Sequence, residues 1–157
     1  IIETTGMADP APVAQTFFVD QMVKSFSRLD GIVTLVDAKH IEQHLDEEKP
    51  EGAENEAVEQ VAFADRILLN KTDLVTEKDL ERVEKRLKAI NGYAPVQRCT
   101  KAEVAVDWVL NIGAFDLKRT LEMDPGMTNS SSGAVLDCLS HPEIRMLCRV
   151  PEYRWRT

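Results

Sequence analysis

Four polar residues, Asn70 to Asp73, directly follow the apolar run 66–69. A strand that ends in this way presents an amide, an ammonium group and a carboxylate at its carboxyl end. Guanine carries two adjacent N–H donors on its Watson–Crick edge, which one carboxylate can accept together, whereas adenine has an acceptor in place of the ring N–H. The motif therefore predicts a guanine site in which Asp73 discriminates between the purines.

The other residues of the motif suit the same site. The amide of Asn70 can contact the base edge and tie neighbouring loops together, and the aliphatic stem of Lys71 can lie along the base plane. A simpler interpretation is a strand followed by a polar turn and a helix, since Asp and Thr are good helix caps.

Runs of strand length alternate with segments of helical spacing along most of the chain. This alternation predicts an α/β fold with a mostly parallel sheet and helices on both faces. In such sheets ligands bind at the carboxyl ends of the strands. Glu3, Asp37, Asn70 and Thr100 fall at expected strand ends and should converge on one edge. The expected strands end at Glu3 or cover 31–37, 66–69 and 95–99, and the expected helices cover 13–26, 57–64, 76–90 and 102–112.

Three blocks carry a more specific similarity: residues 1–10 (Ile-Ile-Glu-Thr-Thr-Gly-Met-Ala-Asp-Pro), 36–38 (Val-Asp-Ala) and 69–75 (Leu-Asn-Lys-Thr-Asp-Leu-Val). In order and approximate spacing they resemble the CobW family of P-loop GTPases, the CobW/HypB/UreG nucleotide-binding domains. The resemblance covers residues 1 to about 116. It implies the second half of a P-loop NTPase fold, in a protein that couples GTP hydrolysis to transfer of a metal, with zinc as the expected cargo, to a client protein.

The resemblance also implies roles for residues outside the first motif. Glu3 would lie near a magnesium ion, directly or through a bound water, and Gly6 would approach the γ-phosphate with its backbone N–H. Thr100 and Lys101 would belong to a loop that contacts the base from its other side. The alternatives are an exposed carboxylate at Glu3, an ordinary turn at Gly6 and a helix cap at Thr100.

Two features of that family have no counterpart in the 157 residues. No glycine satisfies the phosphate-loop pattern G-x-x-x-x-G-K-[ST], and no Cys-x-Cys-Cys cluster occurs. We therefore expect a piece of a longer protein that does not hydrolyse GTP alone. One alternative is a truncated pseudo-GTPase that acts as a protein-binding module, and another is an unrelated NTPase in which the Asn-Lys-x-Asp motif is fortuitous.

Composition excludes several classes of protein. A formal charge of −8 argues against a nucleic-acid surface, which needs clustered Lys and Arg. No apolar run approaches the roughly 18 residues that a membrane span requires. The cysteines, Cys99, Cys138 and Cys148, form no C-x-x-C pair and favour a reducing compartment. We expect a cytoplasmic protein without nucleic-acid or membrane partners, or an organellar one if a leader precedes Ile1.

Two further segments leave alternatives open. Asp37, His40 and His44 have a spacing that could hold a first-row metal, although capping by Asp and solvent-facing histidines explain the same residues more simply. Residues 117–157 read as a poorly ordered linker and tail, with short elements expected at 134–139 and 144–150. An altered reading frame and a partner-binding tail are the two interpretations of this segment.

Overall fold

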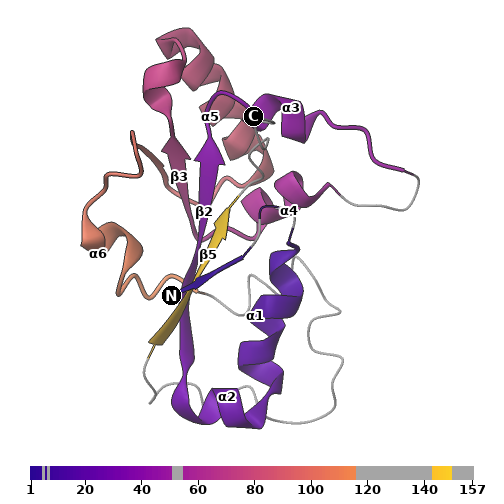
Figure 1. Cartoon of the computed structure of the whole chain (residues 1–157), viewed down its shortest axis with the longest axis vertical. Coiled ribbons are helices and arrows are strands. Elements are labelled where there is room, and N and C mark those ends of the chain that lie inside the picture. The colour runs from indigo at the N-terminus through magenta and orange to yellow at the C-terminus, as the bar shows by residue number, and fades with distance from the viewer. Residues whose placement is uncertain (5, 7, 51–54, 116–142, 150–157) are drawn as a thin grey trace, which may run out of the picture.

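The structure is a computed structural model that describes residues 1–4, 6, 8–50, 55–115 and 143–149. Helices and strands alternate along most of this length (Figure 1). None of the described helices is both long and apolar enough to cross a membrane. In chain order the elements are β1 (Ile2–Glu3), α1 (Pro10–Val19), α2 (Gln21–Phe26), β2 (Arg28–Asp37), α3 (Ile41–Leu45), α4 (Glu56–Ala62), β3 (Arg66–Asn70), the 3-10 turn η1 (Thr72–Leu74), α5 (Glu77–Ile90), β4 (Val96–Arg98), α6 (Val106–Val109) and β5 (Glu143–Arg149).

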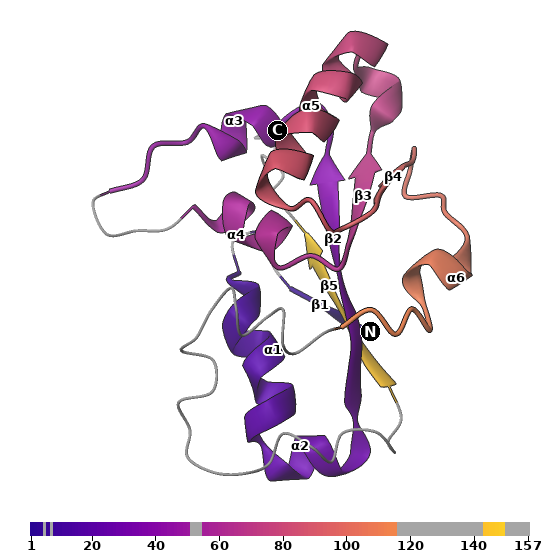
Figure 2. The same ribbon diagram turned by 180° about the vertical axis from the view of Figure 1, so that it is seen from behind.

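The strands form one five-stranded sheet in the order β1-β5-β2-β3-β4, and every neighbouring pair is parallel. Parallel neighbours need crossover connections, which place helices on the faces of the sheet. Helices α3, α4 and α5 cover one face, and the segment around α6 covers the other (Figures 1 and 2). The predicted α/β fold with helices on both faces is confirmed.

The long strand β2 is apolar on both sides because both sides are covered. On one side Val36 packs with residues of β3 and of α3 to α5. On the other side Val33 packs with Leu68 and Cys99, and the segment 104–112 lies against them. Alternation along β2 therefore assigns successive residues to two separate cores.

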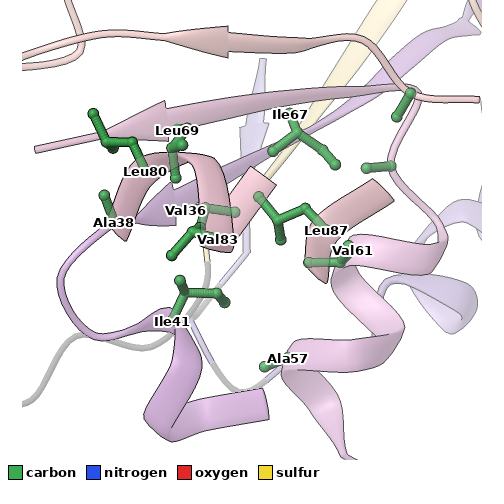
Figure 3. Packing of buried hydrophobic residues seen from close by; sticks show 12 residues of the cluster. Val36, Ala38, Ile41, Ala57, Val61, Ile67, Leu69, Leu80, Val83 and Leu87 are labelled. Carbon is green, nitrogen blue, oxygen red and sulfur yellow. The ribbon is translucent and has the colours of Figure 1, made fainter. Parts of the chain in front are cut away.

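The larger core lies between β2, β3 and helices α3, α4 and α5 (Figure 3). Leu80, Val83 and Leu87 supply the buried stripe of α5 that its spacing predicts. Thr76 begins this helix with a capping box, in which its side chain and that of Asp79 each accept from the other's backbone N–H. The helix ends at Ile90, and Asn91 follows as its carboxyl-terminal cap.

The predicted helix over 13–26 is two helices. The carboxylate of Asp20 accepts the N–H groups of Met22 and Val23, at 2.8 and 3.1 Å, and so caps a new helix. The break turns part of the apolar stripe outward, and Met22 is 76% exposed and Phe26 51% exposed. A local cap has therefore overridden the helical periodicity.

Residues 143–149 form β5 in the interior of the sheet, between β1 and β2. The sequence predicts a short element here, but as part of a tail outside the nucleotide-binding domain. Met146 of β5 pairs with Ile2 on one side and with Ile32 on the other. The rest of the tail, including the element expected at 134–139, lies outside the described residues.

Candidate functional site

The carboxyl ends of β2, β3 and β4 meet at one edge of the sheet. Asp37 pairs with Asn70 in the β2–β3 register, and the Ala38 N–H donates to the Asn70 carbonyl at 2.9 Å. On the other side, the Cys99 N–H donates to the Leu69 carbonyl at 2.8 Å. The loops that follow the three strands therefore lie side by side.

Asn70 joins two of these loops through its side chain. Its Oδ1 accepts the backbone N–H of Ala102 at 3.0 Å and lies 3.6 Å from the Sγ of Cys99. The residue is 8% exposed, so this amide is held in place by protein contacts. Burial also raises the pKa of the Cys99 thiol, which keeps it neutral. The loop-tying role that the sequence suggested for Asn70 matches this geometry.

The loop after β4 has an unusual backbone. Lys101 and Ala102 both have positive φ angles, 54° and 57°, which residues with a Cβ rarely adopt. Such strained residues cluster at ligand sites. Two left-handed residues cannot begin a helix, so the helix predicted over 102–112 is wrong and only α6, four residues long, forms.

Thr100 and Thr72 connect the loop after β4 with the motif after β3. Their hydroxyl oxygens lie 3.2 Å apart, and Thr72 Oγ1 also donates to the Cys99 carbonyl at 3.1 Å. No helix begins at Thr100, so its interpretation as a helix cap is wrong. The contact instead fixes the loop after β4 against the motif after β3.

Lys71 is held in a specific conformation. Its φ is 60°, a third left-handed residue at this edge, and its Nζ donates to Oδ2 of Asp37 at 3.0 Å. The side chain remains 32% exposed. The ammonium group is thus anchored on β2 while part of the side chain stays accessible to solvent.

Asp37 is the centre of a small polar cluster. Its carboxylate also accepts the backbone N–H of Lys39 at 2.8 Å and lies 2.9 Å from Nδ1 of His40. Burial acts to raise the pKa of Asp37, but the hydrogen bonds from His40, Lys71 and Lys39 outweigh it and hold the pKa below its ordinary value. Asp37 is therefore ionised and forms a charge pair with Lys71 at neutral pH.

The contacts of this cluster test whether Asp37, His40 and His44 could together bind a metal ion. The position beside Asp37 that a cation would occupy is taken by the ammonium of Lys71. His44 is buried in α3, one turn further along the chain. Across the described part of the chain, no group of three or more His, Cys, Asp or Glu side chains is arranged to hold a metal ion.

Asp73 lies in η1 and is exposed. It does not cap the helix that follows, because Thr76 does so. The simpler interpretation as a strand, a polar turn and a capped helix thus agrees with the local structure, with Thr76 as the cap. The residues on either side are held by Thr72 and by the N–H of Leu74, which donates to the Lys71 carbonyl at 3.0 Å. A firmly held turn thus presents this carboxylate to solvent three residues after Asn70.

Glu3 and Gly6 lie on a different part of the sheet. Glu3 pairs with Leu147 of β5, which pairs in turn with Val33 of β2, four residues before Asp37. The exposed Glu3 therefore ends β1 at the register of Val33, and not at the edge where β2 and β3 end with Asp37 and Asn70. The backbone then reaches Gly6, whose carbonyl accepts a hydrogen bond from Gln60 of α4 at 3.1 Å.

Two contacts that hold the candidate site are not predicted from the sequence. The sequence places Asp37 at a strand end of the site and offers it as a cap or a metal ligand, but does not indicate that it pairs with Lys71. Gln60 is absent from the predicted site, although it lies between Ala57 and Ala64 on the apolar side of a helix, where a polar residue needs buried partners. That mismatch between residue type and position is the signal that could have found Gln60.

Comparison with known proteins agrees with this geometry. Residues 1–98 match the family described as CobW/HypB/UreG, nucleotide-binding domain. The chain belongs to this family. The interpretation of Asn-Lys-x-Asp as a fortuitous motif in an unrelated NTPase is therefore wrong.

Two relatives that this chain resembles are longer than the chain itself. The zinc chaperone YjiA of Escherichia coli K12 is 38% identical over 121 residues, 77% of this chain and 36% of that protein. The zinc-regulated GTPase metalloprotein activator 1 of Schizosaccharomyces pombe is 34% identical over 136 residues, 86% of this chain and 32% of that protein. The chain thus spans about a third of these relatives.

The fold of this chain also matches that of a solved structure. The crystal structure of Zn(II)-bound YjiA GTPase from E. coli matches with a TM-score of 0.61 at 38% identity, over 71% of this chain and 33% of that one. The CobW-type chain described here therefore has a partial P-loop NTPase fold.

Proposed function

We propose that this chain is the base-recognising half of a guanine-nucleotide-binding domain. The observation that carries the proposal is the shared edge after β3 and β4. There Asn70 is tied to the Ala102 N–H at 3.0 Å, and Asp73, three residues later in the turn η1, presents an exposed carboxylate. Three left-handed residues, Lys71, Lys101 and Ala102, shape the same edge.

The chemistry of guanine fits these groups. The two oxygens of Asp73 can accept the ring N–H and the exocyclic amino group together, an arrangement that adenine cannot offer. The stem of Lys71 can lie along one face of the base while its ammonium remains on Asp37. Thr100 and Lys101 belong to the loop that would contact the base from the other side.

We propose that Glu3 and Gly6 lie on the phosphate side of the site. Magnesium is commonly bound through one or two carboxylates together with phosphate oxygens and water, so a single exposed carboxylate at a strand end fits it. When bound, the ion neutralises charge on the phosphates. Glu3 would orient the ion directly or through a water, and the Gly6 N–H would respond to the γ-phosphate.

The complete protein would couple GTP hydrolysis to delivery of zinc to a client protein. Support for this proposal comes from the names of the relatives, which include a zinc chaperone and a zinc-regulated GTPase metalloprotein activator. The 157 residues contain no phosphate-loop pattern, and that loop supplies the backbone cradle for the triphosphate. We therefore expect weak nucleotide binding and no measurable hydrolysis by this chain alone.

Base exchange tests the proposal. In the Asp73→Asn variant the carboxylate becomes an amide that can donate to the xanthine carbonyl, and so the preference should shift from guanine to xanthine nucleotides. We expect a change of about 10- to 100-fold in the ratio of the two dissociation constants, as for one charged hydrogen bond. Fluorescent GDP and xanthosine diphosphate, titrated into both chains, provide the measurement.

Asp107→Asn is the matched control, because Asp107 is an exposed aspartate in α6. It should leave the preference unchanged. An Asp73→Asn chain with the same guanine preference as the parent would contradict the proposal. Capture of a protein partner without nucleotide binding by either chain would favour the binding-module alternative.

A further inference from the structure

Gln60 of α4 reaches across to the segment that follows β1. Its Nε2 donates to the Gly6 carbonyl at 3.1 Å and to the Ala8 carbonyl at 2.8 Å, although these residues lie more than fifty positions away in the sequence. The side chain is fully buried, with an exposed fraction of 0%. A buried carboxamide that bridges two backbone carbonyls fixes the position of both.

The orientation of this carboxamide follows from its partners. A carbonyl oxygen can only accept, so the NH2 group and not Oε1 must face Gly6 and Ala8. Oε1 then points away from them and has no hydrogen-bond partner among the residues that the structure describes. Thr4 Oγ1, two residues before Gly6, is likewise buried without a partner in that part of the chain.

The Gln60 carboxamide is thus held through its NH2 group, which donates to both the Gly6 and the Ala8 carbonyl. Its Oε1 is a buried acceptor without a donor and bears its full desolvation penalty. Any movement of the Gly6 or Ala8 carbonyl would break its hydrogen bond to Gln60, so the position of these two carbonyls is coupled to α4. This is the property that a ligand-sensing segment needs.

The other side of Gln60 is attached to fixed parts of the fold. Its backbone carbonyl accepts from Thr34 Oγ1 of β2 at 2.7 Å. The end of α4 is held by Asn91 Nδ2, which donates to the carbonyls of Val61, Ala62 and Ala64. Helix α4 is thus anchored to β2 and to the end of α5, and Gln60 extends from that anchored helix.

We propose that Gln60 is a positioning residue for nucleotide sensing. It holds the backbone at Gly6 where the N–H can respond to a terminal phosphate, and it thereby makes the site distinguish a nucleoside triphosphate from a diphosphate. The inference rests on the proposed function, because that function puts the phosphates beside Gly6. Recognition of the base involves Asn70 and Asp73 and does not pass through Gln60.

Amide NMR of the 157-residue chain distinguishes sensing of the terminal phosphate from recognition of the base. Titrated with GTP and with GDP in the presence of Mg²⁺, the parent chain should show larger shifts at the Gly6 and Ala8 amides with GTP. The amides of Asn70 and Asp73 should respond to both nucleotides alike. We expect GTP to bind about tenfold more tightly than GDP, as for one charge-assisted hydrogen bond.

The Gln60→Met variant keeps the side-chain volume and removes both the donors and the unpaired oxygen. It should bring the ratio of GTP to GDP affinity close to one and abolish the GTP-specific shifts at Gly6 and Ala8, while the responses of Asn70 and Asp73 persist. A merely structural role would lower both affinities alike. Gln60→Glu, which keeps the shape and loses the donors, provides the same comparison if the methionine variant does not fold.

Gln97→Met is the matched control, because Gln97 is an exposed glutamine on β4. It should behave as the parent does. GTP-specific shifts that persist in a folded Gln60 variant, or that are missing from the parent, would overturn the inference. Equal responses of Asn70 and Asp73 to adenine and guanine nucleotides would instead count against the proposed function, and the comparison of GTP with GDP would still decide the role of Gln60.

Discussion

At the scale of single residues, the site depends on buried charged groups that are paired by hydrogen bonds. Asp37 is an example, since its side chain is 3% exposed and receives hydrogen bonds from Lys71, His40 and the backbone of Lys39. These donors hold the pKa of Asp37 below its ordinary value in spite of burial. The anchoring of Lys71 should therefore depend on pH.

The Asp37→Asn variant tests this dependence. A depressed pKa in the folded state adds stability that is present above the ordinary aspartate pKa of about 3.9 and is lost as the pH falls through the lower folded value. The parent chain should therefore lose stability on acidification below about pH 4, and the variant should lose less over the same range. At pH 7 the variant should be less stable by about 1–3 kcal/mol, because Lys71 loses a charged partner.

Urea unfolding at a series of pH values measures both effects. Asp107→Asn, at an exposed position, should reproduce the parent curve. Parallel curves for Asp37→Asn and the parent between pH 5 and pH 2 (roughly the range over which a paired aspartate titrates) would contradict the role assigned to Asp37.

At the scale of elements, α5 shows how a short-range signal and a long-range contact act on one helix. Its beginning is local, because Thr76 and Asp79 form a capping box within one turn. Its position is set by Leu80, Val83 and Leu87, which pack against β2, β3 and α4 (Figure 3). The side chain of Asn91 at its end then fixes the end of α4.

Substitutions at the two kinds of position should differ in size. Thr76→Ala removes the capping hydroxyl and should lower the free energy of unfolding by about 1 kcal/mol. Leu87→Ala leaves a cavity in the core and should lower it by about 2–5 kcal/mol. Chemical denaturation gives both values, and Thr76→Ser, which keeps the hydroxyl, is the control. A Thr76→Ala loss as large as that of Leu87→Ala would show that Thr76 does more than cap.

At the scale of the whole molecule, the sheet includes a strand from the far end of the chain. β5 is the described strand that pairs with β1, and it also covers the edge of β2 that faces away from β3. An uncovered edge of a long apolar strand invites pairing with other chains. The segment 143–149 should therefore contribute to the stability of the fold and oppose association with other chains through this edge.

Removal of residues 116–157 tests that contribution. The shortened chain should unfold at lower urea concentration than the 157-residue chain and should associate at concentrations where the longer chain does not, because the edge of β2 is exposed. Urea titration and size-exclusion chromatography provide the two measurements. Equal midpoints and equal elution for the two chains would show that β5 adds nothing to the fold.

The sequence by itself determined the features that depend on neighbours within a few residues. Strand-like apolar runs at 31–37 and 66–69, the stripe of α5 and the position of Asn70 to Asp73 at the carboxyl end of a strand are all confirmed. Periodicity and turn chemistry act over one or two turns, so local sequence is enough to predict them. The predicted parallel sheet follows from the same alternation.

Only the tertiary structure decided which distant groups meet. The pairing of Lys71 with Asp37, the reach of Gln60 to Gly6 and the insertion of β5 between β1 and β2 all join residues more than thirty positions apart. The left-handed backbone at Lys101 and Ala102 depends in the same way on the buried Asn70 that accepts from it. A buried polar group takes whichever partner the packed fold brings within hydrogen-bond distance, and residue spacing along the chain does not specify that partner.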